Sequence, residues 1–367
     1  MNIWELPLAI PTLDEKNRIS LGEGNTPLIK SREIGRQLGL KNLYFKLETV
    51  SPTGSYKDRF AAFAISHMFM EGKKLCIATS SGNTGAALSA YCATAKIRCV
   101  IAVVDGITQA KTQQMLSYGA ELYEIKNFGK DPQVTENTFE LIRKQGESEN
   151  ASLQISAYKF SPIGMTGVQS IAFELEEQLQ TINHIFCPAG GGGLTLSVAR
   201  GFEILLKLKK IEHFPRIHCV QPIGNDTMAS AIRKELNGGK EVQCETEISG
   251  LQVPNLLDAD AVITHLKNRN GQGHLVHDEL VFTVQKKLAS EEGIFSEPAG
   301  ATALAGLYEA VKRDEVDAND HIVCLVTGSA FKDTISLGKM ASSGMHYKWN
   351  LINFQLNLTI CANTESK

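Results

Sequence analysis

Apolar and amphipathic segments alternate along most of the chain. Four apolar runs predict buried strands at residues 74–80, 98–104, 120–126 and 152–158. The stretches between them repeat apolar positions at helical spacing and predict helices at 84–96, 109–119 and 131–146. Asp131 is a candidate N-cap for the last of these helices. This alternation predicts a mostly parallel sheet covered by helices.

A second set of alternating segments follows in the C-terminal half. Further strands are predicted at 184–189, 216–222 and 321–328, and further helices at 167–180, 194–210 and 297–312. Residues 236–280 are polar and glycine-rich and receive no assignment, and no motif is readable after about Lys339. The two sets predict an α/β protein of two domains with a boundary near residues 158–166.

Composition narrows the class of protein. Hydrophobic residues make up 43% of the 367 positions and charged residues 21%, which is typical of a globular chain. A net charge of -3 gives no strong attraction to nucleic acid or to an anionic membrane. No apolar run reaches the ~20 residues of a membrane span, and the N-terminus lacks the pattern of a secretory signal. The eight cysteines form no CxxC pair and the nine histidines no HExxH motif, so we expect reduced thiols in a cytoplasmic protein and no metal site.

Ligands of open α/β sheets bind beyond the carboxyl ends of the strands, so the strand-to-helix turns are the places to look for chemistry. The turn TSSGNTGAA (79–87) has small residues and a helix start, which suit a carboxylate or a phosphate. An ordinary tight turn capped by Ser or Asn explains this stretch equally well.

The turn CPAGGGGLTLS (187–197) places four glycines between a buried strand and an amphipathic helix. Successive amide groups at such a helix start form a phosphate cradle. The dinucleotide pattern GxGxxG fails, because the last glycine position holds Thr195 or Leu196, and no Gly-Lys is followed by Ser or Thr as an ATP-binding loop requires. The cradle therefore disfavours both dinucleotides and ATP.

Two further residues complete a pattern. Thr327 ends the strand in CLVTGSAFKD, and Lys57 lies between a turn and a helix start in SPTGSYKDRF. Either alone is better explained as a simple strand end or a solvated first turn. Together with the glycine cradle, however, a lysine amine and a strand-end hydroxyl match the needs of pyridoxal 5'-phosphate, which combines an aldehyde with a phosphate.

These motifs, in this order, resemble the fold-type II pyridoxal-phosphate enzymes, the group of threonine synthase, serine and threonine dehydratases and cysteine synthase. The likeness covers most of residues 20–335 and is greatest to the threonine synthases. It implies two open, twisted parallel-sheet domains with the active site in the cleft between them. The implied limits are a smaller domain at 45–160, a larger one at 1–44 plus 161–345, and a tail of unknown structure at 346–367. A homodimer is also implied.

The resemblance carries roles for individual residues. Lys57 would form the Schiff base with the cofactor, Asn83 would bind its ring hydroxyl, and Thr327 would contact the pyridine nitrogen. The cofactor phosphate would be held by Gly190, Gly191, Gly192, Gly193 and the amide of Leu194. The substrate carboxylate would face Ser81, Gly82 and Thr84.

Three departures from the threonine synthase pattern bear on the substrate. Gly164 replaces a common arginine, Gly191 replaces a common asparagine, and TGSAFKD stands where TGHGLKD is common. The GGGGL segment is similar to that of the dehydratases, and SGNTG to that of cysteine synthase. The chain is therefore expected to convert O-phosphohomoserine to threonine or to carry out β-elimination or β-replacement on a serine- or threonine-like amino acid. A catalytically silent cofactor-binding protein is a third possibility. Basic residues that could replace the missing phosphate contacts are Arg59, Lys159 and Lys332.

Overall fold

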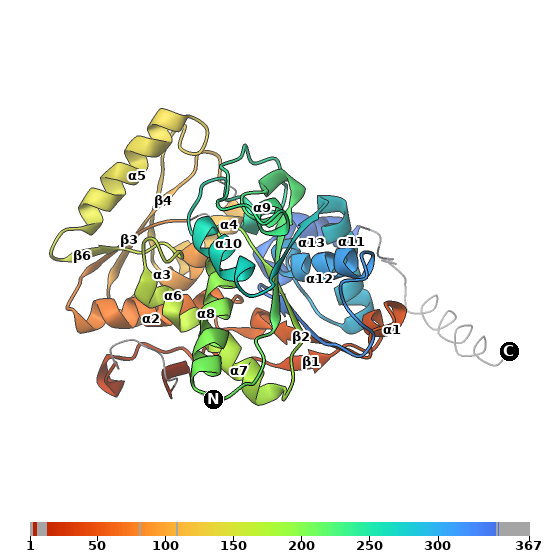
Figure 1. The fold of residues 1–367 in the computed structure, drawn as a ribbon. Coiled ribbons are helices and arrows are strands. Elements are labelled where there is room, and N and C mark those ends of the chain that lie inside the picture. Colours follow the sequence, from red (N-terminus) through yellow and green to blue (C-terminus); the bar gives the residue numbers. More distant parts are fainter. Residues whose placement is uncertain (1–2, 6–12, 81, 108, 343, 345–367) are drawn as a thin grey trace, which may run out of the picture.

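Two open sheets, each covered by helices, make up the fold (Figure 1). The structure is a computed structural model, and it describes residues 3–5, 13–80, 82–107, 109–342 and 344. No helix in these ranges is long and apolar enough to cross a membrane. The predicted α/β class, with two mostly parallel sheets, is confirmed.

The larger sheet has six strands in the order β1-β2-β10-β7-β8-β9. Its strands are β1 Leu28–Lys30, β2 Asn42–Leu47, β7 His184–Pro188, β8 Arg216–Pro222, β9 Gln272–Val276 and β10 His321–Val326. Only β1 runs antiparallel, at the edge; the described neighbours of the other strands pair in parallel. Successive residues of β7, Ile185 and Phe186, belong to different core clusters, so this strand is buried on both faces.

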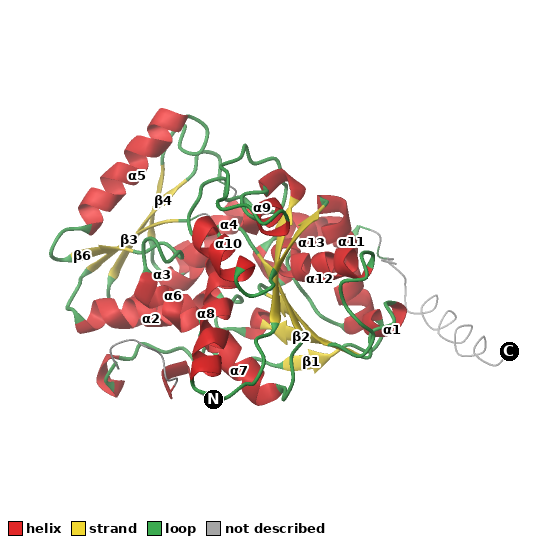
Figure 2. Ribbon diagram, in the orientation of Figure 1, coloured by secondary structure: helices red, strands yellow, loops and turns green. Residues whose placement is uncertain are grey.

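Helices cover both faces of the larger sheet. On one face α12 (Pro298–Val311) packs across β7 to β10 and against α11 (Asp278–Glu292). A side chain at Gly306 of α12 would collide with Val220 of β8, so this glycine allows the close approach. On the other face α8 (Gly193–Lys207) packs on β7 and β8. Figure 2 shows the sheet between these helices.

The smaller sheet is entirely parallel, in the order β5-β4-β3-β6. Its strands are β3 Leu75–Thr79, β4 Arg98–Val103, β5 Glu121–Glu124 and β6 Ala151–Leu153. One face carries α2 (Lys57–Met70) and α3 (Asn83–Ala95), and the other α5 (Pro132–Gly146). The predicted cap of α5 is present, since the Asp131 side chain accepts a hydrogen bond from the Val134 amide.

Smaller elements connect these layers. The remaining helices are α1 Ile34–Gln37, α4 Gln109–Ser117, α6 Pro162–Val168, α7 Ser170–Gln178, α9 Ala229–Arg233, α10 Ala259–Lys267 and α13 Thr334–Ala341. Short 3-10 turns lie at Ile3–Glu5, Glu15–Asn17, Glu48–Val50, Ile223–Asn225, Ser249–Leu251 and Ala330–Lys332.

Two predicted elements differ from the structure, and one stretch without a prediction contains regular elements. The strand expected at 152–158 ends at Leu153, because the chain turns back where the Ala157 amide donates to the Ile155 carbonyl. The helix expected at 167–180 is two helices, α6 and α7, which meet at Gln169. The unassigned stretch 236–280 contains α10 and the edge strand β9.

Candidate active site

Lys57 is the first residue of α2, directly after a tight turn. Gly54 closes the turn with a φ of 89°, a left-handed conformation that glycine adopts without strain, and its amide donates to the Ser51 carbonyl. An ammonium group at a helix N-terminus faces the positive end of the helix dipole, so it does not stabilise the helix there. The position of Lys57 therefore requires another reason than helix stability.

Ser156 joins two of the predicted site residues. The Lys57 amine donates to the Ser156 hydroxyl over 2.6 Å, and the Thr84 hydroxyl lies 2.9 Å from the same oxygen. Lys57 begins α2, Thr84 lies in the first turn of α3, and Ser156 follows β6. All three positions are at the carboxyl end of the smaller sheet, where ligands of such sheets bind.

The four glycines form the turn into α8. Gly192 has a φ of 93°, and the space for a side chain at Gly191 is filled by Leu257 and at Gly193 by Met165. Among the described residues, none accepts a hydrogen bond from the amide groups of residues 190–193. Amides without acceptors at the start of a 15-residue helix are the arrangement that favours an anion.

Asn83 lies close to Gly328, the residue that follows Thr327. The Asn83 side-chain amide donates to Glu297 over 2.6 Å, and a side chain built at Gly328 would contact both residues. The Tyr56 amide donates to the Thr327 carbonyl over 3.1 Å, which ties the residue before Lys57 to the end of β10. The structure therefore gathers Asn83, Thr327 and Lys57 around one region between the sheets.

Other predicted residues are placed as follows. Leu194 is buried in the first turn of α8, and Gly82 is exposed, with its amide donating to the Ser80 hydroxyl. Ser81 lies outside the described residues, as does the tail 346–367.

Sequence reasoning missed three polar residues at this region. Ser156 contacts Lys57, Glu297 contacts Asn83, and the Asp258 carboxylate accepts the amides of Tyr158 and Lys159 next to the glycine turn. Burial raises the pKa of Asp258 above its ordinary value. Glu297 and Asp258 immediately precede α12 and α10, so a search for polar residues at helix starts would have found them.

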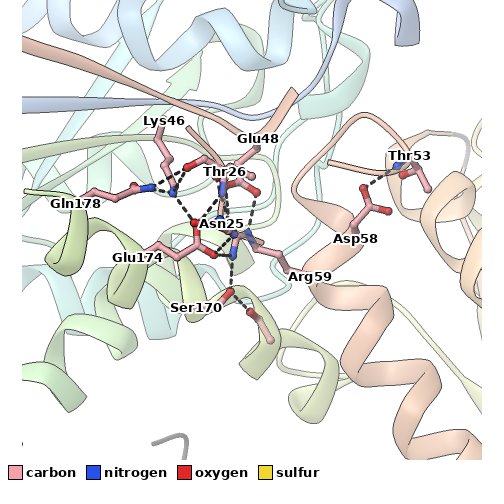
Figure 3. Close-up of polar contacts among 11 residues, drawn as sticks. Asn25, Thr26, Lys46, Glu48, Thr53, Asp58, Arg59, Ser170, Glu174 and Gln178 are labelled. Carbon is pink, nitrogen blue, oxygen red and sulfur yellow. Dashed lines mark hydrogen bonds and ion pairs between the residues drawn. The ribbon is translucent and has the colours of Figure 1, made fainter. Parts of the chain in front are cut away.

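Arg59 is not available as a phosphate ligand, which corrects the expectation that it could replace the missing arginine. Its guanidinium is fully buried and donates to Glu48 and Glu174, at 2.8 Å and 2.6 Å for the closest atoms (Figure 3). Lys46 binds Glu174 from the other side over 2.7 Å. Two cations and two carboxylates thus form a neutral buried network in which the Arg59 charge is already paired.

The other two basic candidates differ in exposure. Lys332 donates to the Thr53 carbonyl and to Gln114, and burial lowers the pKa of its amine. Lys159 is exposed, with its amine 5.8 Å from the centre of the Phe160 ring. Neither has its charge paired as tightly as that of Arg59.

Gly164 does not face this region. A side chain there would collide with Phe60 and touch Ala64 of α2, so α6 and α2 approach closely at this glycine. The sequence difference at Gly164 therefore changes helix packing in this structure, and the position offers no direct route for a side chain to reach Lys57.

The residues present fit pyridoxal 5'-phosphate. The Lys57 amine binds Ser156, and a side chain at Gly193 of the glycine turn would lie 3.2 Å from the Ser156 carbonyl oxygen. The amides of that turn have no acceptor among the described residues, and buried Thr327 at the end of β10 accepts the amide of Tyr56 next to Lys57. The glycine turn has no room for side chains at Gly191 and Gly193, so only its backbone can contact a ligand. The donor set suits an aldehyde on one side and a phosphate on the other.

Comparison with known families shows the family of the chain. The family described as pyridoxal-phosphate dependent enzyme matches residues 19–328, and the chain belongs to it. The chain is an enzyme of the threonine synthase-like group, and its cofactor is pyridoxal phosphate.

Individual relatives refine the picture. The chain is 31% identical to the threonine synthase of Halalkalibacterium halodurans over 88% of this chain and 87% of that protein. It is 29% identical to the threonine synthase of Methanocaldococcus jannaschii over 91% of this chain and 81% of that protein. Among solved structures, processed threonine deaminase isoform 2 of Solanum lycopersicum matches with a TM-score of 0.71 at 22% identity, covering 87% of this chain and 88% of that one. This last likeness shows the fold alone.

Proposed function

We propose that the chain converts O-phosphohomoserine to threonine. The observation that carries this proposal is the likeness of about nine-tenths of the chain to several threonine synthases. Bound pyridoxal phosphate withdraws electrons from the substrate α-carbon and so acidifies its Cα–H bond. The chain's own residues hold the reactants and move the protons.

Lys57 is the proposed site of cofactor attachment and the proton carrier. Its amine lies within hydrogen-bond distance of the Ser156 hydroxyl, which is also bonded to Thr84. Ser156 can therefore hold the amine in position when it is free. Asn83, anchored by Glu297, is proposed to bind the cofactor's ring hydroxyl, and Thr327 its pyridine nitrogen.

The amides of residues 190–193 and that of Leu194 are proposed to bind the cofactor phosphate, using the start of α8. The first turn of α3, with Gly82 and Thr84, is proposed to bind the substrate carboxylate in the same way. Two anions would then be held by two helix starts that belong to different sheets. The domain limits 45–160 and 1–44 plus 161–345, a homodimer and a cytoplasmic location remain proposals.

A second candidate is β-elimination or β-replacement on a serine- or threonine-like amino acid. The observation that favours it is the burial of Arg59, which removes one of three cations that could bind a substrate phosphate. A charge-assisted hydrogen bond contributes about 1.5–3 kcal/mol, so the loss of one lowers affinity roughly tenfold or more.

A substrate panel separates the two candidates. The holoenzyme is incubated with O-phosphohomoserine, threonine, serine, O-acetylserine and O-phosphoserine. We expect phosphate and threonine from O-phosphohomoserine. Brisk turnover of serine or threonine without phosphate release from O-phosphohomoserine would contradict the first proposal and support the second. A failure to exchange the Cα proton of any amino acid in deuterated water would indicate a silent cofactor-binding protein.

Variants at the two remaining cations test how a substrate phosphate is bound. If Lys332 or Lys159 binds the substrate phosphate, its replacement by alanine should raise the KM for O-phosphohomoserine roughly tenfold. The same change should affect the KM for serine, which lacks a phosphate, much less. Lys339→Ala is the matched control, because its exposed amine pairs with Glu247. An equal rise in KM for both substrates would show that the lysine has only a structural role.

A further inference from the structure

The fold brings three cysteines from three elements together in the smaller sheet. Cys76 lies on β3, Cys92 on α3 and Cys99 on β4, and their sulfur atoms all lie within 4.8 Å of one another. Cys76 and Cys99 are direct neighbours in the parallel register, and α3 packs on both strands. Their spacing in sequence follows no metal-binding motif, so the sequence indicated no such site.

Three sulfur atoms at this separation fit a single ion. A zinc–sulfur bond is about 2.3 Å, so three sulfurs around one ion in a plane are about 4.0 Å apart. Sulfurs separated by up to 4.8 Å need to move inward by roughly half an ångström each to reach that geometry. Side-chain rotation within staggered wells and small shifts of α3 can supply this movement.

The surroundings select the kind of ion. Cys76 and Cys92 are fully buried and Cys99 is 5% exposed, among apolar neighbours such as Ala95, Ile97 and Ile101. Soft thiolate ligands favour soft ions such as Cu(I) over hard ions such as Mg²⁺, which prefers oxygen ligands. A buried group of three sulfurs without a carboxylate ligand therefore discriminates strongly between the two classes.

Cys99 is the member of the group that lies nearest in sequence to an exposed turn. Cys99 is the second residue of β4, and it follows a turn at Lys96, which has a φ of 56° and is exposed. The side chain of Arg98, between them, is 59% exposed. Cys99 thus lies three positions after a solvent-facing turn, at the end of the smaller sheet opposite to Lys57.

We propose that Cys76, Cys92 and Cys99 form a three-sulfur binding site for a soft d10 cation, with Cu(I) and Cd(II) as probes. Binding forms metal–sulfur bonds and releases the thiol protons to solvent, without any change of oxidation state. The ion would join β3, α3 and β4, and α3 begins at Asn83 in the candidate active site. The site is independent of the proposed function.

Titration of the holoenzyme with Cd(II) or, under reducing and oxygen-free conditions, Cu(I) tests the site. We expect one equivalent to bind with a thiolate-to-metal charge-transfer absorption and to raise the thermal midpoint of the smaller domain. Removing partners outside the first coordination shell weakens metal sites about 10–100-fold, so Cys92→Ala should weaken binding at least tenfold. Cys219→Ala is the matched control, because Cys219 is equally buried beside Cys187 and belongs to no such group of three among the described residues.

X-ray absorption by the Cd(II)-loaded wild type gives a test that does not depend on the variants folding. We expect a first shell of three sulfur atoms. A shell of oxygen or nitrogen, no uptake by the folded wild type, or equal affinity in wild type and Cys92→Ala would overturn the proposal.

Discussion

Arg59 shows how one residue near the candidate active site is committed to structure. Its guanidinium donates to Glu48 and Glu174, and the Ser170 hydroxyl accepts a further hydrogen bond from it over 2.7 Å (Figure 3). Nearby carboxylates raise the pKa of Arg59 further above its ordinary value despite complete burial, and Arg59 and Lys46 lower the pKa of Glu174 to about 2. The charges persist because each buried ion has opposite partners.

Removing Arg59 should therefore destabilise the fold strongly. Arg59→Ala leaves two buried carboxylates with Lys46 as the single cation of the network, and breaking a buried pair in this way costs about 3–5 kcal/mol. The free energy of unfolding in urea measures the effect. Arg143→Ala, which removes an exposed pair with Glu147 on α5, is the control and should leave that free energy nearly unchanged. Equal losses in both variants would show that the network does not stabilise the fold.

Asp58, the residue after Lys57, differs from the fully paired Arg59 because its buried carboxyl is incompletely hydrogen-bonded among the described residues. One carboxyl oxygen accepts the Thr53 amide over 3.0 Å, and the other has no hydrogen-bond partner among the described residues. Burial raises the pKa of Asp58 from its ordinary value of 3.8 to about 7, against the effect of the Thr53 amide. The folded protein therefore keeps this proton over a range in which the unfolded chain releases it.

The sign of the resulting pH dependence follows from linkage. Between pH 4 and pH 7 the folded state binds one proton more than the unfolded state, so the contribution of Asp58 to stability falls as the pH rises. Asp58→Asn removes the titrating group and therefore this loss of stability. The free energy of unfolding of the variant minus that of wild type should rise by roughly 4 kcal/mol from pH 4 to pH 8. Urea unfolding at several pH values measures the difference. A difference that does not change with pH, as expected for the exposed control Asp314→Asn, would contradict the assignment.

At the scale of elements, three neighbouring strands are joined by a row of imidazoles. His184 on β7, His218 on β8 and His274 on β9 are buried and hydrogen-bonded in series, over 2.9 Å and 2.8 Å. Arg233 lies 3.3 Å from the far nitrogen of His274, and Asp320 lies 3.1 Å from that of His184. Because a guanidinium only donates and a carboxylate only accepts, every ring is satisfied when it is neutral and carries its proton on Nε2.

This row should make the larger sheet sensitive to acid. Burial lowers the pKa of all three rings, to about 3 for His274. Asp320 and Asp317 raise the pKa of His184 and so oppose the effect of burial in part. Three arginines lower the pKa of the rings further, namely Arg216, Arg233 and Arg313. The unfolded chain binds protons below about pH 6.5, so the stability present above that pH is lost as the pH falls toward the folded pKa values.

The slope of the free energy of unfolding against pH reports how many of the three imidazoles take up a proton on unfolding. Each buried ring contributes about 1.4 kcal/mol per pH unit between its two pKa values. His218→Leu should therefore give a shallower acid loss between pH 6 and pH 4 than wild type, even though it is less stable at pH 8. His67→Gln, a change at a partly exposed position on α2, should keep the wild-type slope. Identical slopes in all three proteins would show that the rings titrate alike in the folded and unfolded states.

Element boundaries were predictable where local patterning and packing agree. The strand at 216–222 and the capped helix at 131–146 follow from apolar periodicity and one capping residue. Strand β9 was missed because Gln272–Val276 mixes polar residues with Gly273, whose missing side chain lets the backbone of Ala229 approach. The break between α6 and α7 depends on tight contact with α2 at Gly164 and Gly167, which no local pattern reveals.

At the scale of the molecule, the candidate site is assembled from both sheets. The glycine turn and Thr327 were candidates because ligands of parallel sheets bind at strand ends and these residues follow such ends. Lys57 was a candidate because the cofactor needs a lysine amine. Ser156 could not, since its partner Lys57 is 99 positions away in sequence. Glu297 could be found as a polar residue at a helix start, but its pairing with Asn83, 214 positions away, could not. The pairing of Arg59 was also hidden, because Glu174 is 115 positions away.

Attachment of pyridoxal phosphate to Lys57 is the central claim, and reductive trapping tests it most directly. The purified holoenzyme is treated with borohydride, which fixes the bond between the cofactor and its lysine, and is then digested and mapped by mass spectrometry. We predict a pyridoxyl group on the peptide that contains Lys57 and its absence from the same peptide of Lys57→Ala. A label on another lysine, or a colourless protein that takes up no cofactor, would contradict the account.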